Sequence, residues 1–136
     1  MDTVDTIADK LEVVAGAIGG VCGWYFGGMD GLFYALVAFT VVDYITGVMA
    51  AAVERRLSSS EGLKGIAKKV AIFALIGVMN VLDTEILRQG STLRTAFLFF
   101  FIANEGLSII ENAEKLGIKI PEFIKKTIHS IKEQKE

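Results

Sequence analysis

Two carboxylates, Asp43 and Glu105, lie inside long apolar runs of this sequence. An α-helix beginning at Leu32 would place Asp43 about 16 Å along its axis, near the middle of a bilayer core about 30 Å thick. Glu105 lies at a matching depth in the run 95–110. A carboxylate at mid-depth costs about 2.5–3.5 kcal/mol to insert, and such groups are candidates for function. We find no basic partner at this depth, so we expect a protonated or hydrated state.

Further polar side chains share a helix face with these acids at spacings of three or four residues. We define the polar stripe as Asp43, Thr46, Asn80, Asp83, Asn104, Glu105, Ser108, Glu111 and Asn112. Within it, Asn80 and Asn104 are expected at about the depth of the two acids. One interpretation is a network of interhelical hydrogen bonds that stabilises a monomeric bundle. The other is that the stripes of several copies face one another and line water, which predicts a pore built by a homo-oligomer.

The composition is that of a membrane protein. The chain has 136 residues, which indicates one domain, and 52% of them are hydrophobic. Its charges are gathered at the two ends and in two loops, and the runs between them are almost uncharged. We therefore predict an all-α integral membrane protein.

Four apolar segments are candidate membrane helices, and two amphipathic segments flank them. The candidates are 13–29, 32–53, 70–87 and 94–112, preceded by an acidic segment (1–12) and followed by a basic one (118–136). We predict four spans, with three as the alternative, because the glycine-rich run 13–29 could instead lie in the interface. Small residues that let helices approach closely are expected at Gly19, Gly23, Gly27 and Gly47.

Basic residues between the second and third runs set the predicted orientation. Lys and Arg in short loops stay on the cytoplasmic side, so we expect the loop and the C-terminus inside and the turn near Arg88 outside. The N-terminus is then inside with four spans and outside with three. The basic residues expected to contact anionic headgroups are Arg55, Arg56, Lys64, Lys68, Lys69, Lys125 and Lys126. Ser58 and Glu61 form a capping-box pattern that predicts a helix start.

The sequence lacks a recognisable catalytic constellation. It contains one His and one Cys, with no metal-ligand spacing and no phosphate-binding loop. We therefore predict no enzyme activity, no metal, no cofactor and no nucleic-acid partner.

Several short motifs occur in an order that resembles a known family. They are DxxTG (Asp43, Thr46, Gly47), the serine-rich turn 58–60, GxxGIxxK (Gly62, Gly65, Ile66, Lys69) and NExxSIxEN (Asn104, Glu105, Ser108, Ile109, Glu111, Asn112), followed by Gly117 and Pro121. Together, over roughly residues 32–123, they resemble the phage-lysis and toxin-secretion holins of Gram-positive bacteria and their phages.

The resemblance implies a protein of the bacterial cytoplasmic membrane that associates with itself and opens lesions. An endolysin or a toxin would then leave the cytoplasm through them. Two other functions stay open from the residues alone: a small ion or solute transporter, and a membrane scaffold subunit that recruits a partner through its basic tail. Against the transporter, the first run holds no acid and the two halves show no repeat.

Overall fold

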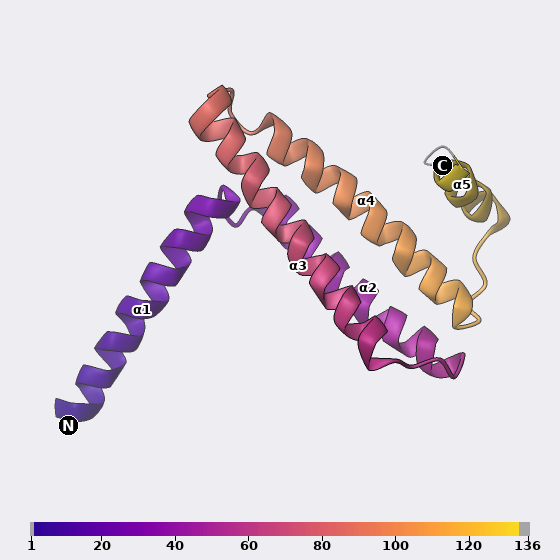
Figure 1. The fold of residues 1–136 in the computed structure, drawn as a ribbon, viewed down its shortest axis with the longest axis horizontal. Helices are drawn as coiled ribbons and strands as arrows, with labels where there is room; N and C mark the ends of the chain where they lie inside the picture. Colours follow the sequence, from indigo (N-terminus) through magenta and orange to yellow (C-terminus); the bar gives the residue numbers. More distant parts are fainter. Residues whose placement is uncertain (1, 134–136) are drawn as a thin grey trace.

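The computed structural model describes residues 2–133, and every regular element in that range is helical. The elements are α1 (Asp2–Phe26), α2 (Gly31–Val53), α3 (Ser59–Val81), a π-helical turn η1 (Leu82–Leu87), α4 (Thr92–Lys115) and α5 (Glu122–Glu133). Figure 1 shows α2, α3 and α4 as an elongated bundle, with α1 projecting from it and α5 to one side of the C-terminal part of α4. The predicted all-α class is confirmed for the described residues.

The core of the bundle is a small set of apolar side chains from three helices. It comprises Phe33 and Leu36 of α2, Ile72 and Ile76 of α3, and Leu98 and Phe101 of α4. The rings of Phe26, Phe33 and Phe73 also contact one another. Most other large apolar residues of these helices are exposed, as expected of surfaces that face lipid.

Three helical segments are long and apolar enough to cross a membrane, namely Gly31–Val53, Ser59–Leu87 and Thr92–Lys115. The glycine-rich run belongs to α1, which also contains the acidic segment that we expected to be separate. Because α1 opens with charged residues and contains several glycines, its apolar part is shorter than that of the other three. The fourth predicted span is therefore not confirmed.

Side chains define the starts of α2 and α3. Asp30 is the N-cap of α2 and accepts a hydrogen bond from the Phe33 amide at 2.9 Å. Ser58 is the N-cap of α3 and accepts from the Glu61 amide, which confirms the predicted helix start. Such caps satisfy backbone donors that a helix leaves unpaired at its first turn.

The described part of α1 has no buried residue. Cβ atoms added at Gly19 and Gly23 would meet nothing within 4 Å, so their role in helix packing stays a prediction. Gly27 instead follows the end of α1 with φ of +77°, a conformation that favours glycine. At the other terminus, Lys125 of α5 pairs with Glu114 of α4 at 2.9 Å. Residues 1 and 134–136 of the predicted terminal segments lie outside the described residues.

Candidate functional site

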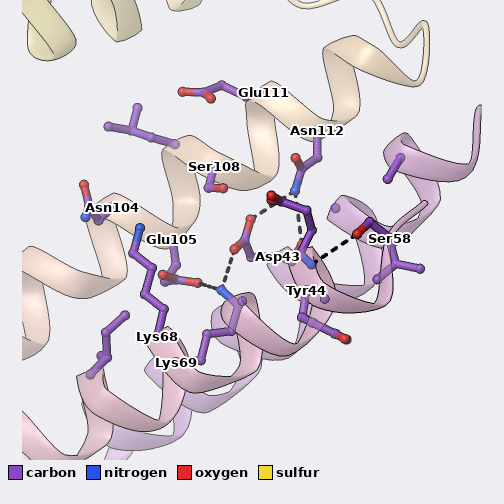
Figure 2. A pocket seen from close by; sticks show the side chains of 18 of the residues that line it. Asp43, Tyr44, Ser58, Lys68, Lys69, Asn104, Glu105, Ser108, Glu111 and Asn112 are labelled. Atoms are coloured by element: carbon purple, nitrogen blue, oxygen red, sulfur yellow. Dashed lines mark hydrogen bonds and ion pairs between the residues drawn. The ribbon is translucent and has the colours of Figure 1, made fainter. Parts of the chain in front are cut away.

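Three charged side chains from three different helices meet at one point. Lys69 Nζ of α3 lies 2.5 Å from Asp43 Oδ2 of α2 and 2.6 Å from Glu105 Oε2 of α4. Figure 2 shows the lysine side chain reaching between the two acids. The side chains of Lys69, Asp43 and Glu105 are only 15%, 12% and 8% exposed. Because both acids contact one ammonium group, their predicted match in depth is confirmed.

The register of the helices explains why these three residues meet. Asp43 lies ten residues before Val53, Lys69 ten residues after Ser59, and Glu105 ten residues before Lys115. At 1.5 Å per residue, each charge is about 15 Å from the same end of the bundle. The ion pairs therefore lie well inside the length of three span-capable helices.

Asn112 lies beside this cluster and binds α2. Its amide Nδ2 donates to the Asp43 carbonyl at 3.1 Å, to Asp43 Oδ1 at 3.0 Å and to Thr46 Oγ1 at 3.0 Å. A Cβ at Gly47 would lie 3.5 Å from the same nitrogen, an ordinary van der Waals contact, so the expected helix-packing role of Gly47 stays a prediction. Asn112 thus fixes one carboxylate while Lys69 neutralises part of its charge.

A cavity of about 580 Å³ opens beside the cluster and is lined by α2, α3 and α4. Asn104, Ser108 and Glu111 of the polar stripe line it, together with Tyr44 and Lys68. Figure 2 shows these side chains around the cluster. Among residues 2–133, no group of three or more His, Cys, Asp and Glu side chains is arranged to hold a metal ion. Its walls carry charged and hydroxyl side chains together with apolar ones, so the polar part of the cavity suits water or small polar groups.

A second polar cluster joins the loop before α2 to the start of α4. Asp83 is fully buried and accepts from the Leu93 and Arg94 amides at 3.1 and 2.8 Å, as an anion does at a helix N-terminus. The Arg94 guanidinium, 3% exposed, donates to the Phe26 and Gly28 carbonyls and pairs with Asp30 at 2.8 Å. Hydrogen bonds from Arg94 hold the pKa of the Asp30 carboxyl below its usual 3.8, although burial opposes this effect.

Asn80 belongs to this second cluster. Its amide donates to the Trp24 and Tyr25 carbonyls at 2.9 and 3.1 Å. The structure therefore divides the polar stripe into two groups. Asn80 and Asp83 lie eleven and fourteen residues along α3 and η1 from Lys69, whereas we expected Asn80 at the depth of Asp43. They bind the C-terminal end of α1 and the start of α4 instead of the other acids.

The expectation that the two acids lack a basic partner is wrong. We assigned Lys69 to a basic collar at the membrane surface, but its Nζ is paired inside the bundle. The neighbouring Arg55, Arg56, Lys64 and Lys68 are exposed, as is Lys126, and their contact with headgroups stays a prediction. Sequence reasoning also missed the Asp30–Arg94 pair. The one available signal was the position of Asp30 just before a helix, where an acid commonly acts as the N-cap.

The fold and the two polar clusters define a helical membrane protein with three span-capable helices that enclose paired charges. Residues 20–133 match the bacteriophage holin family, and the chain belongs to that family. Membership suggests a protein that is not an enzyme.

Relatives extend over most of the chain. An uncharacterized protein of Listeria innocua is 46% identical over 118 residues, covering 87% of this chain and 84% of that protein. An uncharacterized protein of Clostridium perfringens is 37% identical, covering 92% and 91%. A probable holin of Bacillus phage phi105 is 38% identical over 96 residues, covering 71% and 70%. No solved structure matches the chain.

Proposed function

We propose that this protein is a holin that self-associates in the bacterial cytoplasmic membrane and opens pores or lesions. An endolysin or a toxin passes through these lesions during phage lysis or toxin secretion. The observation that supports the proposal best is the cluster of Asp43, Lys69 and Glu105 on three span-capable helices. Burying charges at this depth costs free energy. The same charges can line water once helices from several copies separate and associate.

The proposed orientation places the loop between α2 and α3, and α5, on the cytoplasmic side. The exposed Arg55, Arg56, Lys64 and Lys68 lie at or near that loop, and basic residues in short loops resist translocation. They would contact anionic headgroups, with Lys125 and Lys126 of α5 doing the same at the C-terminus. With three spans, the N-terminus lies outside.

Induction in bacteria tests the function. The protein is expressed with a cytoplasmic reporter enzyme while viability, membrane potential and reporter release are followed. Abrupt death with release of the reporter is expected of the holin. Slow ion or solute flux without release indicates a transporter that uses the same charged cavity, and neither effect indicates a scaffold subunit. Asp43→Asn and Glu105→Gln then test whether the carboxylates take part, since unchanged lysis in both would remove them from the mechanism.

A further inference from the structure

The two ends of α3 are attached to the bundle in different ways. Near its C-terminal end, Asn80 binds backbone carbonyls of α1, and Asp83 of η1 binds backbone amides of α4. Asn80 lies next to η1 and Asp83 lies within it. In the other half, Lys69 spans the space beside the cavity to reach Asp43 and Glu105. That contact depends on one flexible side chain.

Two of the α3 residues that line the cavity are glycines. Gly62 and Gly65 face α2 here, and Cβ atoms at these positions would lie 3.5 and 3.7 Å from Tyr44. The bulky core residues of α3, Ile72 and Ile76, lie toward the opposite end. Side-chain packing therefore holds the N-terminal half of α3 less firmly than the C-terminal half.

A hinge position lies at the far end of the same helix. The π-helical turn Leu82–Leu87 interrupts the regular hydrogen-bond ladder, and Arg88 then takes a left-handed φ of 52°. Here the π-helical turn is the last turn before the loop to α4, and π-helical turns are associated with changes in helix direction. Rotation about η1 would move α3 as one helix, so that its glycine-rich half moves furthest from α2 and α4 and Asn80, close to the hinge, moves least.

We propose that α3 is exchanged between copies of this chain, so that Lys69 of one copy binds Asp43 and Glu105 of the next. Removing Lys69 alone would leave two buried carboxylates uncompensated, which is strongly unfavourable. A replacement must be an ammonium group that reaches the same depth on a helix that packs on Tyr44. The α3 helix of a second copy has these properties, since an exchanged element forms the contacts it formed within one chain. This inference rests on the proposed self-association.

Thiol crosslinking between differently tagged copies tests the exchange. In a Cys22→Ser background, one copy has Gly65→Cys and the other has Tyr44→Cys, so Lys69, Asp43 and Glu105 all remain. The two copies are co-expressed in bacteria and treated with a short bifunctional thiol reagent, and co-purification of the tags is measured separately. Gly62→Cys is the second position on α3, in case Gly65→Cys fails to fold.

The expected result is a mixed-tag crosslink that is lost when Lys69→Met is added to both copies and persists with Lys68→Met, the matched exposed control. A mixed-tag crosslink that is insensitive to Lys69→Met overturns the exchange. Tags that co-purify without a mixed-tag crosslink also overturn it, yet leave self-association intact. Tags that do not co-purify at all overturn both this inference and the proposed function.

Discussion

Lys69 and Asp43 are 26 residues apart in sequence, and their Nζ and Oδ2 atoms lie 2.5 Å apart inside the bundle. The same nitrogen also binds Glu105, so one cation serves two acids. A buried ion pair contributes little net stability compared with apolar residues, but breaking it by removing one partner costs about 3–5 kcal/mol. The cluster is therefore a point where one substitution has a large effect.

Lys69→Met should lower the free energy of unfolding by about 3–5 kcal/mol, because two acids lose their counterion while the stem is replaced by a similar apolar volume. Lys68→Met is the control, since the neighbouring lysine is exposed. Unfolding in mixed detergent micelles, followed by circular dichroism, measures both variants. Equal stability of the two would show that the Lys69 contacts contribute nothing.

Asn112→Ala should destabilise the bundle by about 1–3 kcal/mol, because Asp43 loses a buried donor and Thr46 loses a partner. Asn104→Ala is a suitable comparison, because Asn104 lines the same cavity and is more exposed. The same unfolding measurement applies. A larger loss for Asn104→Ala than for Asn112→Ala would contradict this ranking.

Much of the fold could be predicted because it depends on local patterns. Uncharged runs indicated the three span-capable helices, and Ser58 indicated where α3 begins. Helical spacing also placed Glu105 and Asn112 on one face of α4. Glu105 binds Lys69, which also binds Asp43, and Asn112 binds Asp43 directly. These predictions could be made because helical periodicity and helix capping depend on residues that are close in sequence.

The missed features depend on distant residues. Lys69 stands next to other basic residues in sequence, so charge counting placed it at the surface, yet its partners come from helices 26 and 36 residues away. Arg94 reaches Asp30 across 64 residues. Depth along a helix was also misjudged for Asn80, because α3 begins eleven residues before the apolar run that we used as its start.

The Asp30–Arg94 pair should make stability depend on pH in the acidic range. Because hydrogen bonds from Arg94 lower the pKa of Asp30 below 3.8, the unfolded state binds the proton first. The stabilisation is then fully present above pH 3.8 and is lost as the pH falls through the lower folded-state value. Asn at position 30 keeps an acceptor for the Phe33 amide, so Asp30→Asn removes the charge selectively.

Thermal unfolding of wild type and Asp30→Asn between pH 7 and pH 2 is the measurement. Wild type should be the more stable at neutral pH, and the two should converge at the acidic end. A difference in stability between the two proteins that stays constant over the whole pH range would mean that the charge of Asp30 does not stabilise the contact between the α1–α2 loop and α4.

The approach of α1 to α3 gives the last prediction, because Gly77 leaves space for the Tyr25 ring. A Cβ at position 77 would lie 1.8 Å from that ring, whose hydroxyl donates to the Ala74 carbonyl at 2.7 Å. Gly77→Ala should therefore displace the ring, break this hydrogen bond and loosen the end of α1. Gly20→Ala is the matched control, since a Cβ there meets nothing within 4 Å and Ala favours a helix by about 1 kcal/mol over Gly. Amide hydrogen exchange over residues 22–28 should accelerate in Gly77→Ala and not in Gly20→Ala. Equal protection in both variants would mean that Tyr25 does not fix α1 to the bundle.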